Sequence, residues 1–186
     1  MSSACLIKYT VKGKDVIEWE KLAGEFNVLK EDGEQASNII ALQAIEKIIG
    51  EVNFHEAVEY YISRRPGGEL VRHVLWQIRP WSAMKHCYDI YKSDRNIEEK
   101  RTAVELLRVI ADHRVLVWIY DFLENDDVSI QNWGIRILDQ LLWCNLISTK
   151  DAIDLLELAK THENRDVRYI ADFIYDYVYK REQSLR

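Results

Sequence analysis

Two His-Glu pairs, His55-Glu56 and His162-Glu163, are the residues of this chain that most resemble metal ligands. A protein metal site needs three or more histidine or carboxylate side chains that converge on one point. The two pairs stand at different positions of the helical pattern described below, so a regular fold would not bring them together. The sequence therefore predicts neither a metal site nor a cofactor.

Residues suited to nucleophilic catalysis are equally dispersed. His73, His86 and His113 belong to no Gly-x-Ser-x-Gly, His-Glu-x-x-His or phosphate-binding glycine motif. A catalytic cysteine needs a histidine base in an electropositive setting, and the sequence indicates no such setting for Cys87 or Cys144. We predict no catalytic residue and a protein that is not an enzyme. An enzyme without a recognisable motif is the alternative.

The composition is that of one folded domain. The 186 residues are 48% apolar and 30% charged, with only 7 Gly and 2 Pro, which excludes a disordered or low-complexity chain. The net charge of −6 argues against general binding to nucleic acid or to an anionic membrane. Three widely spaced cysteines, no basic leader with an apolar stretch and no long apolar run favour a cytoplasmic location.

Apolar residues recur as quartets at i, i+3, i+4 and i+7, the spacing that places four side chains on one helical face. Successive quartets of either of two sets are 30 to 37 residues apart. The first residues of the quartets are Trp19, Phe54, Met84, Val115 and Ala152 in one set, and Ala41, Val71, Ala103, Gly134 and Ala171 in the other. The pattern predicts five helical hairpins, each with an A helix and a B helix whose quartets are buried.

Short polar residues mark where several of these helices should begin. The spacing of a capping box occurs at Asp32 with Gln35, Asn53 with Glu56, and Asn96 with Glu99. Residues 125–127 and 164–166 combine small hydrogen-bond acceptors with acidic side chains, which favour the N-terminus of a helix.

A single hairpin cannot bury both of its apolar faces, so hairpins of this kind stack against one another. The segment Asp166-Val167-Arg168, followed by Ala171, resembles the opening of the B helix in HEAT repeats; Asp127-Val128 is a weaker match because Ser129 replaces the arginine. Over about residues 15–181 the chain resembles a HEAT-like repeat protein, although its A helices lack the common proline. The resemblance implies an all-α fold, a HEAT-like α-solenoid of about five helical hairpins. Residues 1–186 would form a single domain, with 1–14 as an extended N-terminal arm.

Acidic residues concentrate in the second half of the chain, where residues 94–186 carry a net charge of −5 against −1 for residues 1–93. The positions of the B helices that should face outward also carry aromatic and arginine side chains, a composition typical of protein interfaces. The predicted partner-binding residues are Trp76, Glu105, Arg108, Arg136, Asp139, Tyr169, Asp172 and Asp176. We expect the two arginines of this set to be partly paired with the acids. A solvated acidic surface is the alternative interpretation.

The size, acidity and HEAT-like pattern resemble those of bacterial immunity proteins that protect cells from contact-dependent growth-inhibition toxins. That resemblance implies a protein partner, a basic nuclease toxin whose active site is occluded, and no membrane or nucleic-acid partner. A HEAT-like scaffold or adaptor is the first alternative. The second is a HEAT-like alkylpurine DNA glycosylase, which would use the B-helix arginines Arg72, Arg101, Arg108, Arg136 and Arg168, although acids on the same helices oppose phosphate binding. The sequence leaves the oligomeric state open.

Overall fold

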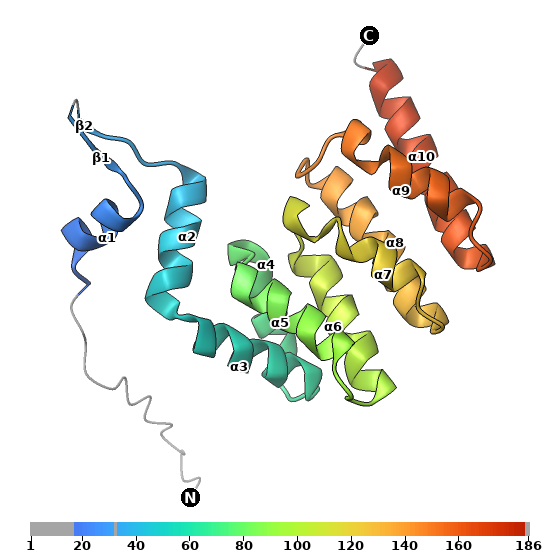
Figure 1. Cartoon of the computed structure of the whole chain (residues 1–186), viewed down its shortest axis with the longest axis horizontal. Helices are drawn as coiled ribbons and strands as arrows, with labels where there is room; N and C mark the ends of the chain where they lie inside the picture. Colours follow the sequence, from blue (N-terminus) through green and yellow to red (C-terminus); the bar gives the residue numbers. More distant parts are fainter. Residues whose placement is uncertain (1–16, 32, 185–186) are drawn as a thin grey trace, which may run out of the picture. The chain divides into compact units, whose positions relative to one another are not determined.

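The computed structural model describes residues 17–31 and 33–184, and the arm predicted over residues 1–14 lies outside these ranges. The described residues are mostly helical (Figure 1). Their elements are α1 (Trp19–Glu25), β1 (Leu29–Lys30), β2 (Gly33–Glu34), α2 (Asn38–Ile49), α3 (Glu51–Ile62), α4 (Gly68–Ile78), α5 (Trp81–Lys92), α6 (Ile97–Ile110), the 3-10 turn η1 (His113–Val115), α7 (Trp118–Leu123), α8 (Val128–Trp143), α9 (Thr149–Lys160) and α10 (Arg165–Ser184). None of the helices in this part of the chain is long and apolar enough to cross a membrane.

The chain divides into two compact units, Met1–Ala44 and Ile45–Arg186, and the boundary falls within α2. In the first unit, β1 and β2 pair antiparallel in a register that matches Leu29 with Glu34. This strand pair was not predicted. Gly33 lies at φ +128°, a conformation that glycine adopts without strain.

The prediction of a buried first hairpin is wrong. Neither α1 nor α2 contains a fully buried residue, and Trp19, the first residue of its quartet, is 65% exposed. The second quartet is also open, since Ile45 and Ile48 are both exposed. The physical reason is that periodicity marks an apolar face but does not supply the neighbouring helix that must cover it.

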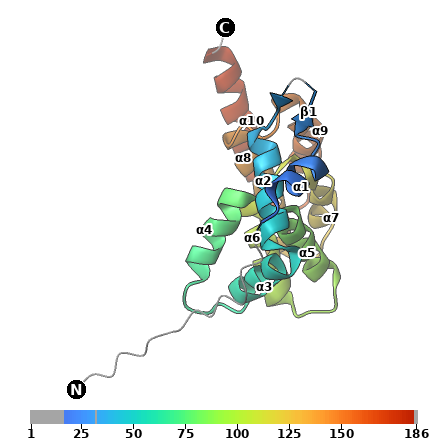
Figure 2. The same cartoon turned by 90° about the vertical axis from the view of Figure 1, so that its left-hand side faces the viewer.

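The second unit pairs its helices in sequence order. Each of α3, α5, α7 and α9 packs against the helix that follows it, as the quartet pattern predicts. Among the first helices of these pairs, α3 packs on α5 and α7 on α9; among the second, α4, α6, α8 and α10 pack successively on one another. Figure 2 shows α4 and α8 towards one side and α5, α7 and α9 towards the other. We call the first helices of the pairs A helices and the second B helices.

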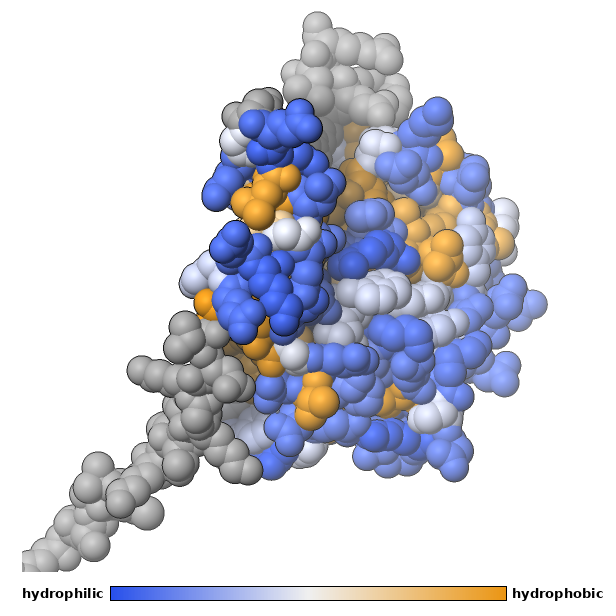
Figure 3. Space-filling view, turned by 60° about the vertical axis from the view of Figure 1, so that its left-hand side comes forward, coloured by the Kyte–Doolittle hydropathy of each residue, from blue (hydrophilic) through white to orange (hydrophobic). Residues whose placement is uncertain are grey.

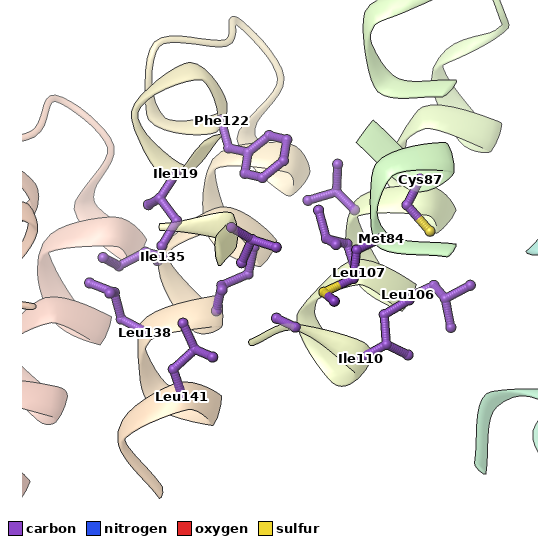
Figure 4. Packing of buried hydrophobic residues seen from close by; sticks show 14 of the residues in the cluster. Met84, Cys87, Leu106, Leu107, Ile110, Ile119, Phe122, Ile135, Leu138 and Leu141 are labelled. Carbon is purple, nitrogen blue, oxygen red and sulfur yellow. The ribbon is translucent and has the colours of Figure 1, made fainter. Parts of the chain in front are cut away.

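Most quartet residues of this unit are buried and build its core, whereas Val74 of α4 and Tyr175 of α10 are exposed, contrary to the prediction. Met84 of α5 lies beside Leu107 of α6, and Ile119 of α7 faces Ile135 and Leu138 of α8 (Figure 4). All five side chains are 0% exposed. From α3 to α10, where each apolar face meets a neighbouring helix, the buried side chains form one continuous core.

A glycine allows α7 and α8 to approach closely. A Cβ atom built on Gly134 would lie 2.5 Å from Cβ of Phe122, so no larger residue fits without movement of the backbone. The small residue expected at the start of the B quartet is thus required by packing at this position.

Large aromatic rings connect the A helices α5 and α7. The Trp118 ring stacks on Trp81 at a centroid distance of 5.3 Å and on Tyr88 at 4.4 Å. The Tyr88 hydroxyl donates a hydrogen bond to the Asp121 carboxylate, and the Tyr91 hydroxyl donates to the Asp121 carbonyl oxygen at 2.8 Å. These rings contribute the A-layer contact that the short helix α7 is too small to provide alone.

The predicted capping residues have mixed outcomes. Asn96 caps α6 and accepts a hydrogen bond from the Glu99 amide at 3.0 Å, but the described hydrogen bonds include no return bond from the Glu99 side chain, so the cap is confirmed and the full capping box is not. Asp127 caps α8, as predicted. Asn53 is not a cap, because α3 already begins at Glu51; Asn53 lies inside the helix and donates to the Ile49 carbonyl. The pair of Asp32 and Gln35 is not tested, since Asp32 lies outside the described residues.

A capping interaction that the sequence did not indicate lies at the start of α5. Pro80 is the N-cap residue and its side chain has no hydrogen-bonding group. The Glu46 carboxylate instead accepts hydrogen bonds from the backbone amides of Trp81 (3.1 Å) and Ser82 (2.8 Å). A carboxylate favours the positive end of the helix dipole, so this contact joins the last part of α2 to α5.

Replacement of Leu107 by alanine should remove about 2–5 kcal/mol from the free energy of unfolding, because the cavity would lie between α5 and α6. Leu70→Ala is the matched control, since Leu70 is 71% exposed on α4. Urea unfolding followed by circular dichroism measures both. A loss for Leu107→Ala no larger than that for Leu70→Ala would contradict this description of the core.

Replacement of Gly134 by alanine should destabilise the protein by about 1–3 kcal/mol, because the new methyl group overlaps Phe122. Gly24→Ala provides the control, since a Cβ atom there meets nothing within 4 Å. The same unfolding measurement applies. Equal stability of Gly134→Ala and the parent protein would show that α7 and α8 are not in close contact.

Asp127 links α8 to α6 through charge. Its carboxylate accepts a hydrogen bond from Nη2 of Arg101 at 2.6 Å and from the amides of Ser129 and Ile130. These groups, the Arg101 guanidinium first, lower the pKa of Asp127 from its usual 3.8. The ionised form therefore stabilises the folded state above that pH, and this contribution is lost as the pH falls through the lowered value.

Asp127→Asn should keep the cap but remove the charge. The variant should be less stable than the parent at pH 7. The difference should begin to shrink below about pH 4 and disappear only when the pH has fallen through the lowered pKa of the folded state, where the parent carboxyl is protonated as well. Urea unfolding at several pH values tests this expectation, with Asp154→Asn on α9 as the exposed control. A difference that is independent of pH would exclude the ion pair as its cause.

Candidate functional site

The eight predicted site residues all lie on B helices. Trp76 is on α4, Glu105 and Arg108 on α6, Arg136 and Asp139 on α8, and Tyr169, Asp172 and Asp176 on α10. Because these four helices pack in succession, the residues belong to one continuous layer, which we call the B-helix surface. None of the eight side chains is fully buried.

Part of this surface is hollowed. Arg72, His73 and Trp76 of α4, together with Arg108 of α6 and Gln140 of α8, line a cleft of about 270 Å³, which we call the arginine cleft. It brings together Trp76 and Arg108, which are 32 positions apart in the sequence. Arg72 was not among the predicted partner-binding residues. Arg72 lies one helical turn before Trp76 on α4, and this spacing is the feature of the sequence that could have identified it as a site residue.

The two arginines of the cleft differ in their partners. Nη2 of Arg72 lies 2.6 Å from a carboxylate oxygen of Glu69. Arg108 makes no ion pair within the described part of the chain, and its guanidinium lies 5.6 Å from the Trp133 ring centroid. The expected pairing of Arg108 and Arg136 with neighbouring acids is therefore absent among the described ion pairs. Arg108 instead interacts with the charges of Asp139 and Arg136 over longer distances.

The environment of Arg108 is unfavourable to its charge. Desolvation lowers the pKa of Arg108; Asp139 acts in the opposite direction, and the positive charge of Arg136 adds to the lowering. The Nε atoms of Arg72 and Arg108 are both buried, and neither has a hydrogen-bond partner among the residues that the structure describes. The cleft thus contains cationic groups whose hydrogen bonding is incomplete.

The opposite end of the B-helix surface is acidic and aromatic. Tyr169 is 72% exposed and Phe173 58% exposed, while Asp172 and Asp176 are exposed and make none of the described ion pairs. These four residues have the spacing i, i+3, i+4, i+7 and so share one face of α10. We call them the α10 stripe. Phe173 was not predicted as a site residue, although it occupies one of the outward rows of the B helices.

Two other B-helix arginines have structural roles. Arg101 binds Asp127 and also contacts Glu98. Nη1 of Arg168 donates to the carbonyl oxygens of His162 (2.6 Å) and Glu163 (2.8 Å). Both guanidinium groups therefore hold helix ends in place.

The two His-Glu pairs lie in unrelated surroundings. The His55 ring stacks on His86 at a centroid distance of 4.2 Å, and His86 donates to Glu59 at 2.8 Å. Arg95 binds the same carboxylate and is the main cause that lowers the pKa of Glu59. Nε2 of His162 donates instead to the Leu123 carbonyl oxygen at 2.9 Å. Within residues 17–31 and 33–184, no three potential ligands gather in a geometry that would hold a metal ion.

The two cysteines among the described residues differ in access to solvent. Cys87 is fully buried in the core, and burial raises the pKa of its thiol, which disfavours the reactive thiolate. Cys144 is partly exposed after α8, where its sulfur lies 3.0 Å from Nε2 of Gln140. The contacts described for these two thiols include no basic group that would activate either of them as a nucleophile.

The surface shown in Figure 3 is mainly hydrophilic, and its apolar side chains form several separate patches. Comparison of the chain with protein-family models, with curated proteins and with solved structures finds no match. The chemistry of the B-helix surface is therefore the basis for any functional assignment.

Proposed function

We propose that this chain is a HEAT-like repeat protein whose B-helix surface binds a protein partner. The proposal for the fold is supported by the pairing of α3 to α10 into four hairpins and by the unbroken row of B helices from α4 to α10. The hairpins that stack in this way leave one long layer of outward side chains, which is the part of a helical repeat that commonly binds partners.

The α10 stripe is the observation on which the binding proposal depends. Large rings such as Tyr169 and Phe173 are expensive to leave in water and supply contact area with little loss of side-chain entropy. Asp172 and Asp176 stand between them without a described counter-ion. Exposed rings alternating with uncompensated acids are suited to a basic protein surface, because the acids accelerate encounter and the rings then hold the complex.

The narrower proposal is an immunity protein that neutralises a basic nuclease toxin. It rests on the resemblance in size, acidity and repeat pattern, together with the acidic end of the B-helix surface. Carboxylates placed in the cleft of a nuclease would occupy the positions of substrate phosphates and exclude RNA or DNA. Inhibition would require binding alone, with no catalytic group or metal from this chain.

A scaffold or adaptor would use the same surface for a different protein. The DNA glycosylase alternative has less support, because Arg72, Arg101 and Arg168 already bind acidic or carbonyl groups of this chain. Only Arg108 and Arg136 of the five B-helix arginines lack such partners among the described residues. Most of the affinity of a protein for DNA comes from cationic side chains that contact phosphates, and two available arginines would supply few such contacts.

The partner proposal is tested with the C-terminal domain of a toxin encoded directly upstream of this chain's gene. Asp172→Lys with Asp176→Lys should slow association by about tenfold at low salt and flatten its dependence on salt, because two charges of the attracting field are reversed. Stopped-flow or surface-based binding measurements give the association rate. Nuclease assays should show that the parent chain inhibits the domain at a 1:1 ratio, the stoichiometry of a blocked active site.

Glu56→Lys with Asp154→Lys is the matched control, because it reverses two exposed acids on the A helices α3 and α9. This variant should bind at nearly the parental rate. If the A-helix pair slows association more than the α10 pair, the interface lies elsewhere. If the upstream domain is neither bound nor inhibited, the immunity proposal is wrong.

A further inference from the structure

The arginine cleft has features that the α10 stripe and the basic-partner proposal do not explain. It lies at the other part of the B-helix surface, between α4, α6 and α8, and its charged side chains are cationic. Arg108 is half-buried there without an ion pair in the described chain, and Arg72 retains a buried Nε without a hydrogen-bond acceptor. A surface used only for basic partners would gain nothing from these groups.

The free protein bears a cost for this arrangement. A guanidinium group removed from water loses hydration, and the loss is recovered only when anions or carbonyl oxygens accept its hydrogen bonds. For Arg108 the loss of hydration is the largest effect; Asp139 and Glu105 offset part of it, and the like charges of Arg136 and Arg72 act in the opposite direction. An anion in the cleft would accept hydrogen bonds from the Arg108 guanidinium, which has no ion pair among the described residues.

The geometry and the surrounding charges indicate which anion fits. Arginine presents parallel N–H groups that match the two oxygens of a carboxylate. The cleft of about 270 Å³ is smaller than most ligand pockets and is suited to a single side chain, with Trp76 available for contact with its apolar stem. A nucleic-acid backbone is disfavoured, since it needs a row of available cations, and Arg108 is the one arginine lining the cleft that has no ion pair among the described residues.

We propose that the arginine cleft binds a carboxylate side chain, glutamate or aspartate, presented by the protein partner. The inference rests on the proposed protein-binding function and extends it, because it specifies a second recognition element of opposite charge on the same surface. The partner would place basic residues against the α10 stripe and one acidic side chain against Arg108, with Arg72 beside it in the cleft and still paired with Glu69. An acidic patch and a cationic cleft on the same surface would fix the orientation of the partner, because a displaced partner would bring like charges together.

The test uses the full chain and needs no partner. The Nε–H signals of arginine are followed by NMR while glutamate with both backbone ends capped is added at constant ionic strength. The Arg108 and Arg72 signals should shift and saturate with capped glutamate, whereas capped glutamine, which differs in its charge, should cause no saturating shift. In Arg108→Met the affinity for capped glutamate should fall by about tenfold or more.

Arg165→Met is the matched control, because the Arg165 side chain is 89% exposed at the start of α10. This variant should bind capped glutamate as the parent does.

Thermal unfolding distinguishes a role of Arg108 in binding from a role in stabilising the fold. Arg108→Met keeps the apolar stem over Trp133 and removes a costly charge, so its melting temperature should equal or exceed that of the parent, and a fall of more than about 3 °C would show that Arg108 is a structural residue.

Inorganic phosphate and a short DNA duplex are the remaining probes. If phosphate binds more tightly than capped glutamate and Arg108→Met abolishes duplex binding, the cleft is a nucleic-acid site and the proposal is overturned. The absence of a saturable shift with capped glutamate overturns it as well. A positive glutamate titration, combined with no effect of the α10 lysine variants on toxin binding, would retain the carboxylate site and reject the proposed toxin interface.

Discussion

The burial of α8 is the constraint on which the rest of the second unit depends. Most of its apolar residues are buried and α6, α7 and α10 pack against it, although Val128 and Trp143 at its two ends are exposed. Gly134 allows α7 to approach without a Cβ atom between them. A 16-residue helix covered on three sides can leave only one face in water. That face carries Arg136 and Asp139, which places charge at the centre of the B-helix surface.

The same packing explains the unequal ends of this surface. Where α4, α6 and α8 lie side by side, long side chains compete for limited space, and the guanidinium of Arg108 is partly desolvated against Trp133. On α10, Tyr169 and Phe173 are exposed. Crowding thus produces the arginine cleft, whereas the α10 stripe lies in the open.

Polar contacts between helices refine an arrangement that the apolar core establishes. Asp127 both caps α8 and binds Arg101 of α6, and Glu46 caps α5 from the last part of α2. Each carboxylate satisfies free amides at a helix N-terminus while it joins two elements. Such contacts set helix position within a layer, because they need particular atoms, whereas apolar contacts tolerate small displacements.

The sequence by itself determined the helical class, the sequential pairing from α3 to α10 and the assignment of the eight site residues to outward positions of the B helices. These properties follow from the 3.6-residue period, which is local and can be read from one helix at a time. Tertiary structure alone decided that Trp19, Ile45 and Ile48 stay exposed, that Glu46 caps α5, and that Arg108 lacks the acidic partner expected for it. Each of these outcomes depends on which atoms of distant segments lie opposite the side chain, and no periodic pattern within a single helix contains that information.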